Sequence, residues 1–263
     1  PALSVVAAAA EGRSVAPVPA TCREVRVERL ASAEAAADLF ADACAQGAAC
    51  AWVRNAVDEA VAAVAMLRAR GLEAELLHAR FALEDRQRIE ERVLARFGRE
   101  RGAGGGVLVA TQVIEMSLDL DFDAMVSDLA PVGALIQRAG RLWRHMDRRP
   151  AAGRPVPGPA LHVLSPDPGA VEGARWAHPV LGAGAWVYPQ DLLWRTADAV
   201  LGAGAIRAPE GLRALIESVH GEAGDRPPLP EPIEADERER LGRAATGGAA
   251  ARRNVVDPWK DYA

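Results

Sequence analysis

The sequence predicts a doubly wound α/β fold with a mostly parallel sheet, followed by a smaller, mainly helical C-terminal region. Between residues 25 and 145, short apolar segments alternate with stretches that have helical character. Residues 107–110 are apolar throughout, as expected for a strand that is buried on both faces. Strands that alternate with helices of about ten to fifteen residues form parallel sheets with helices on both sides.

The N-terminal part of this pattern carries helix signals at the expected places. Ser32 is suited to cap the first helix, with Glu34 in its first turn. Gly71 ends the second helix, because glycine readily adopts the backbone conformation that follows a helix. Acidic residues in the first turn favour the start of the third helix. We therefore expect strands at 25–30, 48–53 and 74–77, and helices at 32–46, 58–70 and 84–97.

The alternation of strands and helices continues to about residue 164, and the sequence after it has mainly helical character. A segment at 147–159 is rich in arginine, proline and glycine, which is typical of a linker or surface loop. These changes predict one α/β domain over residues 1–165, and a linker with part of a helical accessory domain over 166–263. Further strands are expected at 107–110, 125–129 and 160–164, and further helices at 134–146, 189–201, 209–219 and 236–253.

Composition limits the class of protein. The chain has 263 residues and a net charge of -5, which argues against a surface covered in basic residues but allows a local basic groove. Cys22, Cys44 and Cys50 form no C-x-x-C pair, so we expect reduced thiols and neither a zinc ribbon nor a disulfide framework. No segment has the length to span a bilayer, so we expect a cytoplasmic protein without a membrane partner. The missing initiator Met leads us to expect a piece of a longer chain.

The segment 107–123 offers the first candidate site. Thr111 and Gln112 follow a buried strand, and ligands of open α/β sheets bind beyond the carboxyl ends of strands. The alternative is that both side chains cap the next short helix. Alternating acidic residues at 119, 121 and 123 suggest a calcium loop, but alanines stand at 124 and 130, where such a loop needs Gly and Glu. We therefore predict no metal site.

The segment 135–148 offers the second candidate site. At helical spacing, its polar side chains form one stripe and its apolar side chains another. The glycine inside the expected helix costs about 1 kcal/mol relative to alanine, which indicates a close approach to the backbone. Arginine is used without lysine, and its planar guanidinium suits bidentate contact with phosphate oxygens. The alternative is a solvated basic face. The stripe comprises Gln137, Arg141, Arg144 and Arg148, with Arg138 at its edge and Gly140 within the helix.

Together the two segments resemble two motifs of superfamily-two helicases. Ala-Thr-Gln followed by Ser-Leu-Asp at 110–119 resembles the fifth motif, and Q-R-x-G-R-x-x-R at 137–144 resembles the sixth. The resemblance implies that the fold is the second RecA-like domain of such a helicase. It implies catalytic roles for Arg141 and Arg144 as arginine fingers and for Gln137 at the γ-phosphate or the attacking water. It also implies ATP contacts for Arg138, Gly140, Asp119 and Ser117, and nucleic-acid contacts for Thr111 and Gln112.

A narrower resemblance is to the CRISPR-associated helicase-nuclease of type I interference systems. It rests on residues 76–81 and 85–90, on the run 110–123, on 137–145, and on Tyr188-Pro with Leu-Leu-Trp-Arg-Thr at 192–196. It implies partners: single-stranded DNA, a guide-RNA surveillance complex, and the first RecA-like domain and nuclease domain of the same protein. It also implies that His78 and Arg80 face nucleic acid, whereas an ordinary strand-end hydrogen bond is the alternative for His78.

Several expected parts are absent from the sequence. No G-x-x-x-x-G-K-[S/T] loop occurs, and the glycines at 102–106 precede a strand instead of following one. There is also no acidic box, and none of the five histidines is followed by Asp. We therefore expect ATP and Mg²⁺ to be bound mainly by a first RecA-like domain outside this chain, which should not hydrolyse ATP efficiently alone. Tryptophans at 176, 186, 194 and 259 could stack on bases, but packing in the interior is the favoured interpretation.

Two other functions remain open at this point. An RNA helicase or a restriction-type translocase shares both motifs in looser form, and stimulation of ATP turnover by DNA or by RNA would separate them. A RecA-like module that binds a protein partner without catalysis is the second alternative. Binding to single-stranded DNA that does not weaken with added salt, or no binding, would favour that module.

Overall fold

The computed structural model describes residues 3–5, 13–15, 23–102, 104–116, 118–222 and 226–254. Its main feature is a seven-stranded sheet in the order β5-β6-β4-β7-β8-β3-β9. Every neighbouring pair in this sheet is parallel except β3 and β9. The mostly parallel, doubly wound sheet that the sequence predicted is therefore confirmed. The strands are β3 (Arg23–Leu30), β4 (Ala49–Val53), β5 (Ala74–Leu77), β6 (Gly106–Ala110), β7 (Ala124–Asp128), β8 (Ala160–Leu164) and β9 (Ala205–Ala208).

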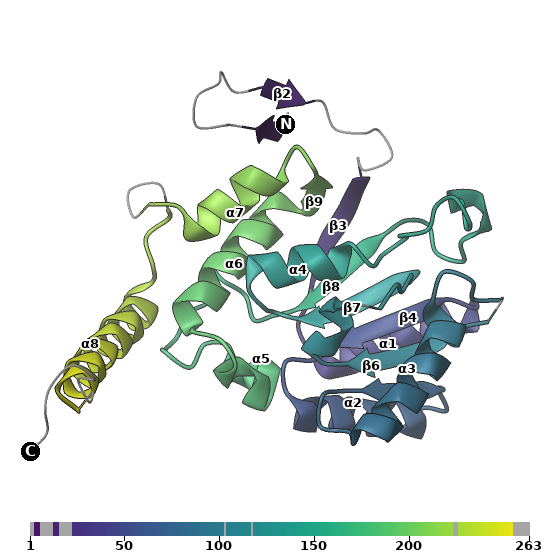
Figure 1. The fold of residues 1–263 in the computed structure, drawn as a ribbon, viewed down its shortest axis with the longest axis horizontal. Helices are drawn as coiled ribbons and strands as arrows, with labels where there is room; N and C mark the ends of the chain where they lie inside the picture. The colour runs from purple at the N-terminus through teal and green to yellow at the C-terminus, as the bar shows by residue number, and fades with distance from the viewer. Residues whose placement is uncertain are drawn as a thin grey trace, which may run out of the picture.

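Helices pack against both the strands and one another (Figure 1). In Figure 1, α4 is drawn in front of the sheet, and α8 extends away from the rest of the chain. A separate two-stranded antiparallel sheet joins β1 (Leu3–Val5) and β2 (Arg13–Val15). The α-helices are α1 (Ala33–Ala45), α2 (Val57–Ala69), α3 (Leu83–Phe97), α4 (Val132–Ala139), α5 (His178–Leu181), α6 (Gln190–Ala203), α7 (Leu212–His220) and α8 (Glu231–Asn254). The short 3-10 helices are η2 (Gln112–Glu115), η3 (Ala151–Gly153) and η4 (Gly182–Trp186).

The centre of the sheet forms the core. Every residue of β4, β6 and β7 is buried, because these strands are covered by helices and carry apolar side chains on both faces. Ser32 caps α1 as expected, since its hydroxyl accepts a hydrogen bond from the Ala35 amide at 3.2 Å. A rigid core of this kind fixes the positions of the loops that leave the carboxyl ends of the strands.

Helix α4 ends earlier than the sequence predicted. The expected helix at 134–146 stops at Ala139, with Gly140 as its C-cap. Beyond that point the chain pairs with the segment before β7: the Phe122 amide donates to the Arg141 carbonyl, and the Trp143 amide donates to the Phe122 carbonyl, both at 2.9 Å. Trp143 takes a positive φ of 49°, which is incompatible with a continuing helix. The expected helical stripe of arginines is therefore wrong beyond Gly140.

The sheet also extends past the domain boundary expected at residue 165. Strand β9 pairs with β3 through the register Val25↔Ile206, and α6 packs against β3. Residues 190–208 therefore pack on the same sheet as residues 23–164. The segment 147–159 is likewise more than a surface loop, because the Arg154 side chain within it is fully buried.

The cysteines and helices of the described segments carry two smaller findings. Cys50 is buried and Cys44 is partly buried, both as free thiols, whereas Cys22 lies outside the described residues. None of the helices in the ranges given above combines the length and apolar character that crossing a bilayer requires.

Candidate nucleotide and nucleic-acid interface

The carboxyl ends of β4 and β6 bring polar side chains together, as parallel strands do at one edge of a sheet. Gln112, in the first turn after β6, donates from Nε2 to the Asn55 carbonyl at 3.0 Å and to the Tyr188 hydroxyl at 3.3 Å. Asn55, which follows β4, donates from Nδ2 to the Leu129 carbonyl at 2.8 Å. Gln112 thus links the loop after β6 to β4 and to the region before α6.

Thr111, His78 and Arg80 occupy different environments at this edge. Thr111 is only 4% exposed, and its amide donates to the Leu77 carbonyl at 3.1 Å. His78 is buried and stacks on Phe81 with ring centroids 4.1 Å apart. Arg80 is exposed and reaches Asp58 at 3.5 Å. Of the four predicted nucleic-acid residues, which include the partly buried Gln112, Arg80 alone is exposed in this conformation.

The hydrogen bond of His78 corresponds to the alternative interpretation of that residue. Its Nδ1 accepts from the Arg80 amide at 3.1 Å. Burial lowers the pKa of His78, and the charge of Arg80 lowers the pKa further. His78 therefore shapes the turn that carries Arg80 as a neutral acceptor, which supports a positioning function for its ring.

Arg138 lies inside the domain. Its guanidinium donates to the Glu115 carboxylate at 2.7 Å from Nη2 and to the Ser127 hydroxyl at 2.8 Å from Nη1, and its side chain has no exposed surface. Arg138 was predicted to contact ATP. In this conformation a buried guanidinium with these partners cannot reach a phosphate, so the structure assigns it to holding η2 against α4 and β7.

Arg141 is tied to the segment between η2 and β7. Its Nη2 donates to the Glu115 carbonyl at 3.1 Å, and its Nη1 donates to the Leu118 carbonyl. Burial lowers the pKa of Arg141, the positive charge of Arg144 lowers it further, and Asp119 and Glu115 oppose both effects. Arg141 is thus a partly buried cation whose present acceptors are neutral carbonyl groups.

Arg144 is more exposed and faces Asp119. Its Nε donates to the Asp119 carboxylate at 2.8 Å, and its side chain is 41% exposed. Asp119 also lies 3.2 Å from Nε2 of His145. The two arginines and Asp119, which the sequence placed on separate motifs, are therefore in one cluster next to the loop that follows Thr111.

The remaining predicted ATP residues are placed as follows. Gln137 is exposed on α4, and Gly140 ends that helix instead of lying inside it. The three atoms nearest to a Cβ built on Gly140 are backbone atoms of Gln137 and Ile136, in the last turn of α4, the closest at 3.2 Å. The close approach inferred from the sequence is therefore internal to the chain. Ser117 lies outside the described residues.

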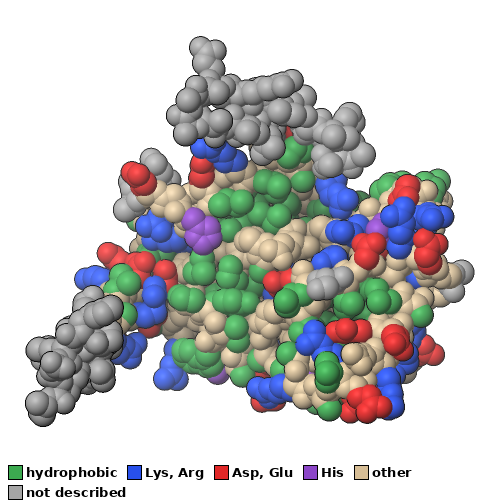
Figure 2. Space-filling model, viewed as in Figure 1, with side chains coloured by type: hydrophobic (Ala, Val, Ile, Leu, Met, Phe, Trp, Pro, Cys, Tyr) green, Lys and Arg blue, Asp and Glu red, His purple; other side chains and the backbone are tan. Residues whose placement is uncertain are grey.

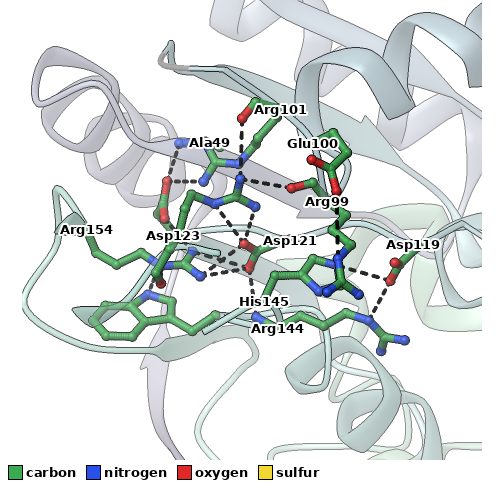
Figure 3. A network of polar contacts seen from close by, with 12 residues as sticks. Ala49, Arg99, Glu100, Arg101, Asp119, Asp121, Asp123, Arg144, His145 and Arg154 are labelled. Carbon is green, nitrogen blue, oxygen red and sulfur yellow. Dashed lines mark hydrogen bonds and ion pairs between the residues drawn. The ribbon is translucent and has the colours of Figure 1, made fainter. Parts of the chain in front are cut away.

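A buried network of ion pairs adjoins this cluster (Figure 3). Arg154 donates to Asp121 at 3.0 Å and to Asp123 at 2.8 Å, and Arg101 donates to Asp123 at 2.8 Å. Arg149 donates from Nε to Asp121 at 3.0 Å. Among the described residues no group of His, Cys, Asp or Glu is arranged to hold a metal. Asp121 and Asp123 instead bind arginines.

The same network explains why Arg144 is in place. Oδ1 of Asp121 accepts from the Arg144 amide at 2.7 Å, so a buried carboxylate fixes the backbone that carries the exposed guanidinium. Burial alone would raise the pKa of Asp121, but hydrogen bonds and charge from Arg149 and Arg154 outweigh it and lower the pKa. Asp121 is therefore ionised and acts as a positioning residue.

Sequence reasoning missed four residues that contribute to this site. Glu115 accepts hydrogen bonds from Arg138. Two arginines, Arg149 and Arg154, bind Asp121. Arg23 on β3 donates to the Leu142 carbonyl at 3.3 Å. The alternating aspartates were a sequence signal for the arginine contacts, because buried carboxylates that hold no metal need cationic partners. The arginine-rich segment after residue 147 supplied those partners.

A second missed group lies at the end of β7. Asp128 is fully buried and accepts from Nε of Arg54 at 3.1 Å and from the Asn55 amide at 2.9 Å. Burial raises the pKa of Asp128, although Arg54 opposes this effect. Arg54 also donates to Glu59 at 3.2 Å, which fixes the start of α2 beside the site.

Comparison with known proteins identifies relatives of this chain. Residues 46–147 match the family model described as CRISPR-associated nuclease/helicase Cas3, C-terminal. The chain is 36% identical to the CRISPR-associated endonuclease/helicase Cas3 of Escherichia coli over 154 residues, which covers 57% of this chain and 16% of that protein. It is 40% identical to Cas3 of Thermus thermophilus over 153 residues, covering 55% and 15% respectively. The aligned part is thus less than a fifth of either relative.

Solved structures agree with this placement over more of the chain. The crystal structure of T. fusca Cas3 is similar with a TM-score of 0.75 at 29% identity, covering 96% of this chain and 30% of that one. The structure of T. fusca Cas3 with AMPPNP gives a TM-score of 0.72 at 30% identity, covering 92% of this chain and 28% of that one. A CRISPR RNA-guided surveillance complex before nicking gives a TM-score of 0.69 at 28% identity, covering 94% of this chain and 30% of that one. Residues 46–147 therefore match the C-terminal part of the CRISPR-associated nuclease/helicase Cas3 family, and the fold of nearly the whole chain is similar to part of the solved Cas3 structures.

Proposed function

We propose that this chain is the second RecA-like lobe of an ATP-driven single-stranded-DNA translocase that acts with a nuclease in CRISPR antiviral interference. One observation carries the proposal. The Arg141 guanidinium contacts the carbonyls of Glu115 and Leu118, in the loop that follows Thr111 and Gln112. A change at the nucleotide side would therefore be transmitted through η2 to the residues at the nucleic-acid side.

The nucleotide would be shared between two lobes. The sequence has no phosphate loop, so ATP and Mg²⁺ would be held mainly by the first RecA-like domain. This lobe fits the phosphate end, because Arg141 and Arg144 are partly exposed guanidinium groups on one short segment. The similarity to T. fusca Cas3, solved with AMPPNP, supports nucleotide binding. When bound, the nucleotide supplies the phosphoryl group whose transfer drives movement.

The two arginines would stabilise charge on the phosphoryl oxygens during transfer. An arginine finger contributes about 10³ to 10⁵ in rate. Arg141 now binds neutral carbonyls and Arg144 a half-exposed carboxylate, and exposed ion pairs contribute at most about 1 kcal/mol. Arg144 can therefore exchange its present acceptor for phosphate oxygens at low cost, and Arg141 would exchange neutral carbonyls for charged oxygens. Gln137, exposed on α4, would orient the attacking water.

The partners follow from the same assignment. Single-stranded DNA would cross the edge formed by Gln112, Thr111 and Arg80, while Asp119 couples this edge to the arginines. The similarity to a structure of a surveillance complex before nicking supports recruitment to such a complex. The first RecA-like domain would face α4 and the Arg141 segment.

Steady-state ATP hydrolysis by the intact protein tests this proposal. We expect stimulation by single-stranded DNA that exceeds stimulation by RNA of the same sequence, and no turnover by the 263-residue chain alone. Stronger stimulation by RNA would favour an RNA helicase. Hydrolysis that responds to neither nucleic acid, together with salt-insensitive DNA binding, would favour a protein-interaction module.

A further inference from the structure

One tryptophan differs from the others in the described part of the chain. Trp52, Trp143, Trp176 and Trp194 are buried, whereas Trp186 is 56% exposed. The indole groups of Trp176 and Trp194 also donate to the backbone carbonyls of residues 167 and 168, each at 2.9 Å. The interpretation of packing in the interior thus holds for these two, and it does not hold for Trp186.

Trp186 is surrounded by groups that suit a nucleic acid. The Arg175 guanidinium carbon lies 5.8 Å from the Trp186 ring centroid, and the His178 ring lies 5.6 Å away at an angle of 52°. Val187, the next residue, is also exposed. Arg175 lies over the indole ring, so its cation can attract a phosphate, while the rest of the 56% exposed Trp186 offers a surface for a base.

The backbone that carries Trp186 is fixed to the sheet. Within η4, the Ala183 amide donates to Glu59 at 3.1 Å, and Nε2 of Gln190 donates to the Ala185 carbonyl at 2.8 Å. A Cβ built on Gly184 would lie 3.2 Å from Cβ of Asn55, so η4 lies directly against the loop after β4. The exposed indole is therefore held on a rigid support and is not at the end of a free loop.

The position of η4 connects Trp186 with the predicted nucleic-acid edge. Tyr188, two residues on, accepts a hydrogen bond from Gln112, the residue after Thr111. Asn55 reaches the Gly184 carbonyl at 3.5 Å and its own carbonyl accepts from Gln112. The face shown in Figure 2 has apolar and uncharged surface across its middle, with charged groups toward its rim. Trp186 thus extends the Gln112 edge.

We propose that Trp186 stacks on a base of single-stranded DNA, with Arg175 and His178 beside the ring on the path of the adjoining phosphates. The inference rests on the proposed function, because it assumes that DNA crosses the Gln112 edge. Stacking on an aromatic ring does not distinguish bases, so this contact fits a translocase that moves along any sequence.

Equilibrium binding of a fluorescein-labelled oligothymidine to the intact protein tests the proposal. Trp186→Ala should weaken binding about tenfold or more, and Trp186→Phe should retain most of the affinity. The slope of affinity against salt should stay unchanged, because stacking releases no counterions. Ile216→Ala, which removes a 40% exposed apolar side chain from α7, is the matched control and should bind like wild type.

An oligonucleotide of abasic sites separates stacking from other contributions. Wild type and Trp186→Ala should bind this probe equally, because it keeps the phosphates and lacks the bases. Equal affinities of the two proteins for oligothymidine, or an equal loss on both probes, would overturn the stacking function and leave the proposed function standing. Failure of wild type to bind oligothymidine would overturn both. Should Trp186→Ala unfold, Trp186→Leu, which keeps an apolar side chain but has no aromatic ring, takes its place on both probes and decides in the same way.

Discussion

Arg138, Arg141 and Arg144 lie within one short segment, yet their environments differ. Arg138 has no exposed side-chain surface and binds Glu115, Arg141 binds backbone carbonyls, and Arg144 is 41% exposed beside Asp119. Arginine thus stabilises the fold at position 138 and offers an accessible cation at position 144. The order follows from the end of α4, because residues after Gly140 leave the helix and turn toward the loop before β7.

Replacing Arg138 should affect stability more than chemistry. Arg138→Met leaves the Glu115 carboxylate and the Ser127 hydroxyl without their partner, and removal of one partner from a buried ion pair costs about 3–5 kcal/mol. We expect the free energy of unfolding, measured by denaturant titration, to fall by about this amount. Arg213→Ala on α7, whose side chain is 82% exposed, should leave it nearly unchanged. An unchanged free energy for Arg138→Met would contradict the structural function.

At the scale of elements, the loops around β7 are held by buried ion pairs. Asp121 and Asp123 bind Arg101, Arg149 and Arg154, which come from the loop before β6 and from the segment after α4 (Figure 3). These contacts join two long loops that have little regular structure. The position of Arg144 depends on them, since its amide donates to Asp121.

The Asp121 network should make stability depend on pH at the acid end. The pKa of Asp121 in the folded chain lies below its ordinary value of 3.8. A lowered carboxylate pKa stabilises the fold above the unfolded value, and the contribution is lost as pH falls through the folded value. We expect the free energy of unfolding of wild type to decrease as pH falls below about 4.

Asp121→Asn supplies the comparison. The variant should be less stable than wild type at pH 7, because an amide cannot bind the two arginines as an ion, and its decline with acid should be shallower. Thermal unfolding measured from pH 7 to pH 3 would show this. Parallel curves for wild type and the variant would mean that other carboxylates carry the acid dependence.

The sequence predicted these elements to different degrees. Apolar runs placed β4, β6 and β7, and Ser32 placed the start of α1, because both signals are local. The end of α4 depends on pairing between Phe122 and Leu142, which are far apart in the sequence. Strand β9, with the sequence AIRA, is short and pairs at an edge, so its local pattern carries little information. The sequence placed Arg141 and Arg144 on one motif and Asp119 on another, and neither motif could show that the chain brings them together or that Arg138 is buried.

At the scale of the whole molecule, strands from before and after residue 165 share the seven-stranded sheet. Leu193, Ala197 and Val200 of α6 are buried, and Ile206 of β9 lies opposite Val25 of β3. The chain therefore needs residues up to α7 to complete the lobe. This arrangement also brings η4 and Trp186 to the edge that Gln112 defines.

Truncation tests the extent of the lobe. A chain that ends at residue 165 exposes the edge of β3 and the apolar surface beneath α6, so it should aggregate or lose cooperative unfolding. A chain that ends at residue 221 keeps β9, α6 and α7 and should unfold in one transition. Circular dichroism during heating compares the two. Cooperative unfolding of the shorter chain at the same temperature would restore the domain boundary at residue 165.

We propose that Arg141 acts on the phosphoryl group during transfer. The most direct test of this proposal is single-turnover ATP hydrolysis by the intact protein with DNA present, alongside the dissociation constant of ATP. Arg141→Ala should slow hydrolysis by about 10³-fold or more, while the dissociation constant rises less than about tenfold, because the contact matters most in the transition state. Hydrolysis by Arg141→Ala at the wild-type rate would contradict the account.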